Sequence, residues 1–228
     1  MCKEETNLSS TAPCETHSCC MPDDLRISDE YSNFDTEVVR HELSDKLIAK
    51  AESKTLVVNL FAGPGAGKST TAAGVFFELK SRGINCELAA EYAKDLCWEE
   101  RHRTFQDQIY IFGKQYHRIY RLLGQVECVI TDSPILLTPV YDGEKRATLE
   151  KLAVEEHNKM WTYNAFLKRR KAFNPKGRNH DYEESQELDR IVADMLWKHL
   201  IPFETFEGTP EGKNAIVHKV LMLLNKET

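Results

Sequence analysis

The sequence lacks the features that would place it in a membrane or mark it for export. No apolar run approaches the roughly 18 residues that a transmembrane helix needs. Its first residues, MCKEETNLSS, have no apolar core of the kind that signal peptides carry. We therefore expect a cytoplasmic chain that has no membrane partner and keeps its thiols reduced.

Positive charge is also scarce. The 228 residues hold 30 Lys and Arg against 36 Asp and Glu, which gives a formal net charge of -6. A protein whose main task is to coat nucleic acid carries an excess of cations, so this class is disfavoured, while a local basic groove stays compatible. Internal repeats are absent, and so is the base-reading pattern NKxD of GTPases. The length fits one α/β domain with an extension.

The N-terminal segment is poor in large apolar residues. Residues 1–34 are rich in Ser, Thr, Pro, Asp and Glu, a composition that predicts a disordered tail. Their possible zinc ligands are Cys14, His17, Cys19 and Cys20. No second Cys-x-x-Cys pair follows, so reduced thiols are the favoured interpretation and zinc the alternative. Residues 35–54 form a predicted helix and linker, with leucines and valines at every fourth position.

From residue 55 to residue 228 the sequence alternates between apolar runs and amphipathic segments. Such alternation predicts an α/β domain with a five-stranded parallel sheet and helices on both faces. The predicted strands are 55–61, 84–90, 126–131, 162–169 and 201–207. The predicted helices include 104–123, 145–159 and 210–225, a helix after residue 67 that ends at Gly83, and one bearing Leu188, Ile191, Val192 and Met195. Three cysteines in apolar contexts are predicted core residues: Cys86, Cys97 and Cys128.

The stretch FAGPGAGKST, residues 61–70, fits the phosphate-binding loop pattern, with Ala62 in place of the first glycine. Small residues let backbone N–H groups curl around an anion, and the helix that follows directs its positive end at the same group. Lys68 would supply charge to the outer phosphates, and the Ser69 hydroxyl suits Mg²⁺. The nucleotide-binding residues predicted here are Gly63, Pro64, Gly65, Ala66, Gly67, Lys68, Ser69 and Thr70. This domain is thus predicted to have a P-loop NTPase fold that binds ATP and Mg²⁺.

Two carboxylates follow neighbouring predicted strands. Asp132 ends the third strand, where it could hold Mg²⁺ beside Ser69; its alternative role is to cap the next helix. Glu91 follows the second strand, where it could accept a proton from an acceptor hydroxyl; its alternative is a surface loop carboxylate. A basic loop at 168–182 could be a lid for phosphate transfer or a solvated loop.

Together, FAGPGAGKST, EYAKD, ITDSP and RRKAFNPKGR resemble the P-loop kinases of the nucleoside and nucleotide kinase group. Residues 55–225 look most similar to ATP-binding proteins of bacteriophages that are related to the ribosylnicotinamide kinase domain. This resemblance implies Glu91 as base, Asp132 as Mg²⁺ partner, and Arg170 and Arg178 as lid arginines. It also implies the host cytoplasm as the location if the source is viral.

The acceptor site is implied by the same resemblance. The segment TFQ resembles the one in deoxynucleoside kinases whose glutamine reads the base, which makes Gln106 a candidate. By helical phase, Gln108 and Gln115 flank the apolar stripe better, and Gln106 and Gln108 stay open as alternatives. Ser133 stands where many relatives carry an arginine, and Arg101 or Arg103 could replace that charge.

These features predict a kinase that transfers the γ-phosphate of ATP to a hydroxyl of a nucleoside or nucleotide. Phage relatives also include kinases that act on 5-hydroxymethyluracil within DNA, so a modified base in DNA is a further candidate acceptor. The alternatives are a nucleotide-dependent regulatory ATPase or GTPase that acts through a protein partner, and a nucleotide-binding scaffold that does not hydrolyse. The sequence does not fix the oligomeric state.

Overall fold

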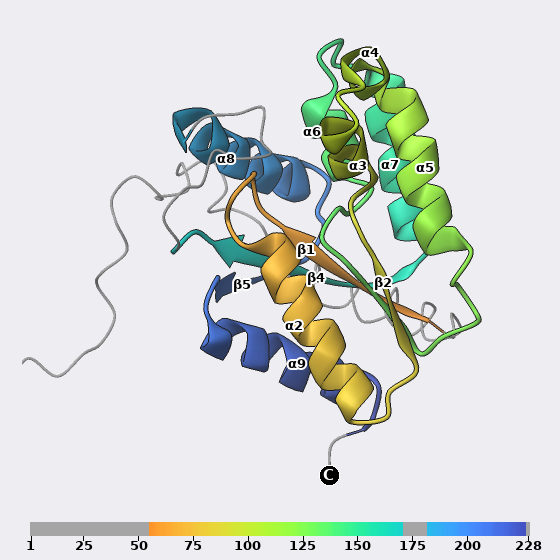
Figure 1. Ribbon diagram of the computed structural model, residues 1–228, viewed down its shortest axis with the longest axis vertical. Coiled ribbons are helices and arrows are strands. Elements are labelled where there is room, and N and C mark those ends of the chain that lie inside the picture. The colour runs from red at the N-terminus through yellow and green to blue at the C-terminus, as the bar shows by residue number, and fades with distance from the viewer. Residues whose placement is uncertain (1–54, 171–181, 227–228) are drawn as a thin grey trace, which may run out of the picture. The chain divides into compact units, whose positions relative to one another are not determined.

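The computed structural model describes residues 55–170 and 182–226, all of which belong to one compact unit, Ser44–Thr228. Five parallel strands form one sheet in the order β2-β3-β1-β4-β5, as Figure 1 shows. The predicted tail, its possible zinc ligands and the helix and linker at 35–54 lie outside the described residues. The strands are β1 (Leu56–Phe61), β2 (Cys86–Ala89), β3 (Cys128–Thr131), β4 (Trp161–Lys168) and β5 (Glu204–Glu207).

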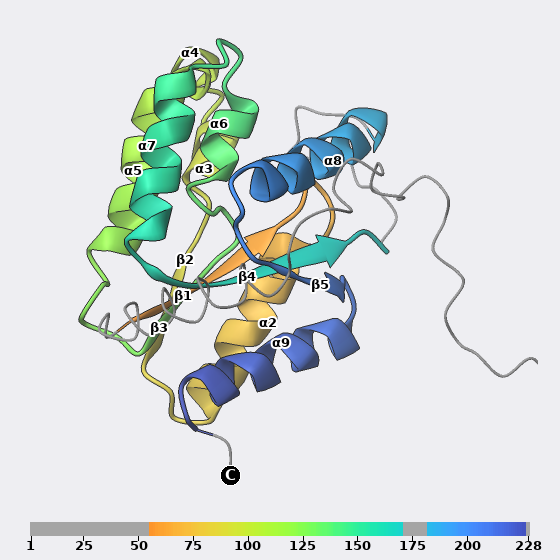
Figure 2. The same cartoon turned by 180° about the vertical axis from the view of Figure 1, so that it is seen from behind.

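Helices cover both faces of the sheet. Figures 1 and 2 show α2 and α9 on one face and α5, α7 and α8 on the other. The helices are α2 (Lys68–Ser81), α3 (Tyr92–Trp98), α4 (His102–Gln106), α5 (Gln108–Tyr120), α6 (Leu137–Tyr141), α7 (Ala147–Asn158), α8 (Tyr182–Lys198) and α9 (Pro210–Leu223). The predicted α/β fold is therefore confirmed.

Two hydrophobic clusters hold these layers together. Side chains alternate along β1: Val58 and Leu60 pack with α2 and α9, while Val57 and Phe61 pack under the helices of the opposite face. Every residue of β1 is buried, as expected for the central strand of a parallel sheet. Each apolar side chain of β1 contributes about 1.5–3 kcal/mol when fully buried. The central strand is thus packed into both clusters.

One predicted helix differs from the structure. The segment 104–123 breaks into α4 and α5 at Asp107, whose backbone leaves the helical region (φ -82, ψ 81). The Asp107 carboxylate accepts a hydrogen bond from the Tyr110 amide and so caps the second helix. In a single helix over 104–123, Ile109 would share the apolar stripe of Phe112 and Ile119. That expectation is wrong: Ile109 is 57% exposed, because the break at Asp107 changes the helical phase, and Gln108 and Gln115 are buried instead.

The cysteine prediction is confirmed for the two strand residues. Cys86 and Cys128 are buried and lie opposite each other on β2 and β3. Cys97 lies on α3 and is partly exposed. Among the described residues, no helix combines the length and the hydropathy required to cross a membrane.

Candidate functional site

The phosphate loop, residues 62–69, connects the buried end of β1 to the start of α2. Gly65 and Gly67 have φ values of 81° and 104°, a left-handed conformation that favours glycine at both positions. Ala62 and Ala66 are fully buried and fix the base of the loop. Gly67 is the N-cap of α2, whose first turn has no acidic residue, so the positive end of the helix is open to an anion.

Lys68 occupies the centre of this loop. Its ammonium donates hydrogen bonds to the carbonyl oxygens of Ala62 at 2.7 Å and Gly63 at 3.0 Å. Burial lowers the pKa of Lys68, while Glu91 and Asp132 act in the opposite direction and raise it. These opposing effects put the predicted cation and both predicted carboxylates within electrostatic reach of one another.

Glu91 lies just beyond the carboxyl end of β2, at the N-cap of α3. Its backbone is extended (φ -62, ψ 121), and its side chain makes no capping hydrogen bond. Burial raises the pKa of Glu91, the charge of Lys68 opposes this rise, and Asp132 adds to it. The Glu91 side chain thus lies within electrostatic reach of Lys68 and Asp132, and its role as base stays a prediction.

Asp132 follows β3 directly and is 5% exposed. Its Oδ1 is the one buried side-chain oxygen or nitrogen without a hydrogen-bond partner among the described residues. The helix that follows, α6, has Leu136 as its N-cap, so Asp132 is not its cap. A buried carboxylate oxygen without a partner fits a cation, and Mg²⁺ needs only one or two protein carboxylates when phosphates and water complete its shell. The described residues contain no group of three or more His, Cys, Asp or Glu that could hold a metal by itself.

A buried hydrogen-bond network fixes the spacing between the two acidic segments. The Gln115 carboxamide of α5 accepts a bond from the amide of Tyr92, next to Glu91, at 2.9 Å. Its Nε2 lies 3.4 Å from the hydroxyl of Thr131, next to Asp132. That hydroxyl donates to the carbonyl of Ala89 at 2.8 Å, at the end of β2. Gln115 is 1% exposed, so it is a positioning residue for both carboxylates.

A second group of polar contacts links the phosphate loop to α8. Asp189 accepts a hydrogen bond from the amide of Gly63 at 2.5 Å and forms an ion pair with Arg169 at 3.0 Å. Arg169 also donates to the carbonyls of Pro64 at 2.7 Å and Ser185 at 3.1 Å. This side chain is 9% exposed, and its guanidinium therefore joins the end of β4, the phosphate loop and α8.

Arg169→Ala is expected to destabilise the fold, because it leaves Asp189 partly buried without its cation. Breaking one partner of a buried ion pair costs about 3–5 kcal/mol. Since Asp189 keeps some exposure, we expect the lower end, which lowers Tm by roughly 6–12 °C in a domain of this size. Thermal unfolding with and without nucleotide measures this change.

The adjacent arginine is the matched control for this prediction. Arg170 is 63% exposed and pairs with Glu207 on the surface, so Arg170→Ala should cost no more than about 1 kcal/mol. Equal losses in the two variants would contradict the role given to Arg169.

The remaining predicted site residues fall into three places. Ser69 and Thr70 lie exposed in the first turn of α2, at the phosphate loop. Arg101, Arg103 and Gln106 are exposed in or beside α4, while Gln108 is buried and donates its amide to the carbonyl of Phe105 at 2.9 Å. Arg178 lies outside the described residues. The assignments of these residues therefore stay predictions.

Sequence reasoning missed several residues around this site. Asp189 looks like one acidic residue among many on an amphipathic helix, and nothing in its neighbourhood signals a contact with residue 63. Tyr141 was also missed: burial raises its pKa, and Glu91 and Asp189 add to the rise, so its phenol lies near both carboxylates. Helical phase does place Gln115 beside the apolar stripe, and a glutamine there needs an internal partner once buried, but the sequence does not show that its partners adjoin Glu91 and Asp132.

No protein-family model matches the chain, and the search of curated proteins finds no match. Solved structures with similar folds include deoxyadenosine kinase from M. mycoides. With dCMP and dCDP bound it has a TM-score of 0.47 and 19% identity, over 75% of this chain and 100% of that one. The structure of the same enzyme with dATP bound has a TM-score of 0.46 and 18% identity, over 74% of this chain and 99% of that one. Shikimate kinase from Bacteroides thetaiotaomicron has a TM-score of 0.41 and 14% identity, over 75% and 98%.

Proposed function

We propose that this protein is an ATP-dependent kinase that transfers the γ-phosphate to a hydroxyl of a nucleoside- or nucleotide-type acceptor. One observation carries the proposal: a partly buried lysine of a phosphate-type loop lies within electrostatic reach of two carboxylates from neighbouring strand ends. Phosphoryl transfer asks the protein for positioning and for charge around the migrating group, more than for covalent chemistry. A cation, a proton acceptor and a metal partner within one crevice meet that need.

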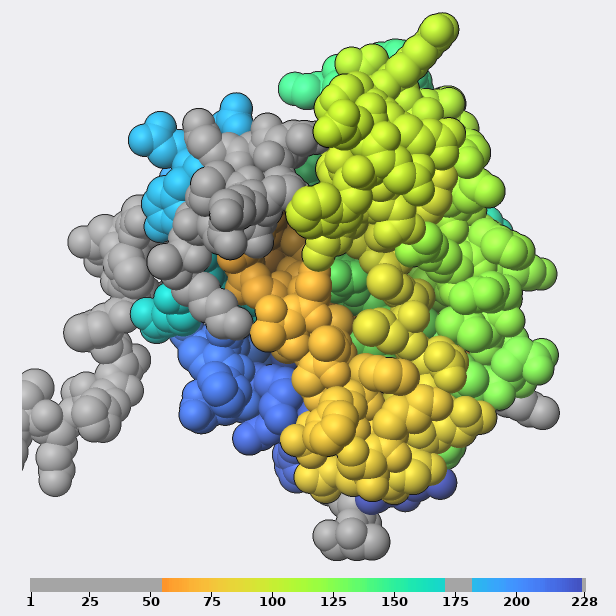
Figure 3. Space-filling model, in the orientation of Figure 1, coloured from red at the N-terminus to blue at the C-terminus, as the bar shows by residue number. Residues whose placement is uncertain are grey.

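Each residue has a separate role in the proposal. Lys68 and the amides of the phosphate loop hold and neutralise the phosphates. Glu91 orients the acceptor hydroxyl and accepts its proton. Asp132 and Ser69 would hold Mg²⁺, which supplies positive charge to the transferring group when it is bound. Figure 3 shows the surface of α2 and the surface of the α3 and α4 region on the same face of the molecule, which fits an acceptor reaching the loop from outside.

Further residues are proposed for the lid and for the acceptor site. Arg170 and Arg178 are proposed to cover the phosphates, and Arg101, Arg103, Gln106 and Gln108 to contact the acceptor. Arg170 would first have to leave its ion pair with Glu207. This costs little free energy, because both side chains are more than a third exposed. Gln108 would have to give up its bond to Phe105, so the exposed Gln106 is the more accessible of the two glutamines.

A screen of acceptors with ATP labelled in the γ-phosphate tests the proposal directly. The panel holds nucleosides, nucleotides, and a DNA oligonucleotide with and without 5-hydroxymethyluracil. We expect the label to move to one acceptor class and ATP turnover to rise when that class is added. Turnover that no acceptor changes, but that a protein partner accelerates, would instead favour a regulatory ATPase.

The pH dependence of kcat/KM provides a further prediction. A base acts only when deprotonated, and burial raises the pKa of Glu91 above its ordinary value of 4.5. Activity should therefore be lost, as pH falls, at a pH above that value. Glu91→Gln should abolish this acidic limb, whereas Glu99→Gln on the exposed end of α3 should reproduce the wild-type profile. If activity falls only at or below pH 4.5, the ordinary pKa of a glutamate, then Glu91 is not the base.

A further inference from the structure

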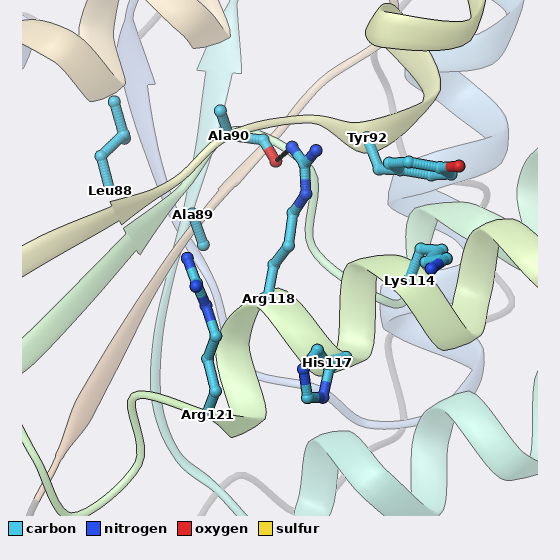
Figure 4. A pocket seen from close by; sticks show the side chains of 8 residues that line it. All are labelled: Leu88, Ala89, Ala90, Tyr92, Lys114, His117, Arg118 and Arg121. Atoms are coloured by element: carbon cyan, nitrogen blue, oxygen red, sulfur yellow. Dashed lines mark hydrogen bonds between the residues drawn. The ribbon is translucent and has the colours of Figure 1, made fainter.

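A groove lies outside the phosphate loop, between α5 and the edge strand β2. Its cavity measures about 430 Å³, and Figure 4 shows that Arg118 and Arg121 reach from α5 toward the end of β2. Its lining consists of Leu88, Ala89, Ala90, Tyr92, Lys114, His117, Arg118 and Arg121. Four of these eight residues lie on one face of α5 and its C-cap, because their spacing follows two helical turns: Lys114, His117, Arg118 and Arg121.

The positive charge of this groove is mostly uncompensated. Arg118 is engaged by Asp95 at 2.6 Å and by the carbonyl of Ala90 at 2.9 Å. Within residues 55–170 and 182–226, no carboxylate pairs with Lys114, His117 or Arg121, and all three are exposed. In a chain with a net charge of -6, the unpaired Lys114 and Arg121 beside Arg118 indicate a local site for an anion.

The length of the row indicates what kind of anion fits. Lys114 and Arg121 are seven residues apart, which is roughly 10 Å along a helix. One phosphate group is shorter than this, whereas four successive phosphates of a stacked nucleic-acid strand, which rise roughly 3.4 Å each along its axis, span it. We propose that this groove binds the backbone of single-stranded nucleic acid.

Aromatic side chains beside the groove support a strand whose bases are free. Tyr92 lines it, with the guanidinium of Arg118 over its ring at 5.1 Å. Tyr110 packs against Tyr92 edge to face at 5.8 Å, is 37% exposed, and has the Lys114 ammonium 5.3 Å from its ring. Alternating cations and aromatic rings are typical of single-strand sites, where phosphates meet the cations and unpaired bases stack on the rings. A duplex hides its base faces, and an acidic peptide has no bases to stack.

The groove also lies next to the candidate active site. Its lining residues Ala90 and Tyr92 flank Glu91 in the chain. A strand seated in the groove would therefore bring a nucleotide close to the proposed base. That second step rests on the proposed function, whereas binding in the groove does not.

Fluorescence anisotropy of the full-length chain, without ATP, tests the binding. The probe is a labelled mixed-sequence DNA strand of about 12 nucleotides, within the usual site size of such proteins. With contacts from Lys114, Arg118 and Arg121, log K should fall with log salt with a slope of about -2 between about 50 and 200 mM. Lys114→Ala combined with Arg121→Ala should weaken binding about tenfold and reduce the slope by about 1.4. Tyr110→Ala should weaken it at least about fivefold.

Controls separate this surface from general charge. Lys151→Ala combined with Arg190→Ala removes one lysine and one arginine from exposed helix faces elsewhere, and should leave affinity and slope unchanged. Equal losses in the two double variants would overturn the proposal. So would a duplex of the same sequence, or a polyglutamate peptide of equal charge, that binds as tightly as the single strand. Because the assay contains no ATP, a failed acceptor screen leaves this result standing, and the reverse also holds.

Discussion

Lys68→Ala is expected to slow phosphate transfer by about 10² to 10³. The Lys68 ammonium lies inside the phosphate loop, bonded to the carbonyls of Ala62 and Gly63, and removing it takes a fixed positive charge from the site. Steady-state transfer to the acceptor found in the screen measures the loss. ATP affinity, measured separately by equilibrium binding, should also fall, since the same charge serves bound and transferring phosphates.

Lys80→Ala is the matched control, because Lys80 is in the last turn of the same helix and pairs with Glu87 on the surface. It should transfer phosphate at the wild-type rate. A folded Lys68→Ala protein that turns over ATP as fast as wild type would show that this loop does not serve the reaction. Circular dichroism and thermal unfolding of both variants exclude loss of fold as the cause.

Glu91→Gln should reduce transfer to the acceptor by at least about a hundredfold while ATP affinity survives. The amide keeps the shape and the hydrogen-bonding reach of the carboxylate, but it cannot take the acceptor proton. Glu99→Gln changes an exposed carboxylate at the end of α3 and should behave as wild type. Single-turnover transfer with ATP already bound measures the chemical step apart from nucleotide binding.

Asp132→Asn distinguishes the two carboxylates. If Asp132 serves Mg²⁺, its amide variant should need a higher Mg²⁺ concentration to reach half-maximal rate, whereas Glu91→Gln should not. If Glu91→Gln transfers phosphate at the wild-type rate, Asp132 becomes the candidate base.

The strands of the sheet and the long helices between them could be predicted, because apolar runs and amphipathic segments mark them directly in the sequence. All five strands lie within or overlap the predicted segments, and the phosphate loop follows the first. The positions of Glu91 and Asp132 could be predicted for the same reason, since residues after parallel strands meet at one edge.

The contacts between distant elements could not be predicted. Neighbouring arginines illustrate this: Arg169 and Arg170 look equivalent in sequence, yet one is buried against the phosphate loop and the other pairs on the surface. Only the direction in which β4 ends decides between them. The break at Asp107 is a second case, because a single side-chain cap outweighs an apolar pattern that would continue through it.

Gly63 restricts which segments of this fold could be exchanged with those of another protein. The loop pattern leaves the identity of this position open, yet a Cβ built there would lie 2.4 Å from the carbonyl oxygen of Ser185 and 2.9 Å from a carboxylate oxygen of Asp189. A phosphate loop transplanted from another protein, with a side chain at this position, would push α8 away. Exchange between such proteins would therefore have to move the first loop and α8 as one block, although more than a hundred residues of sequence separate them.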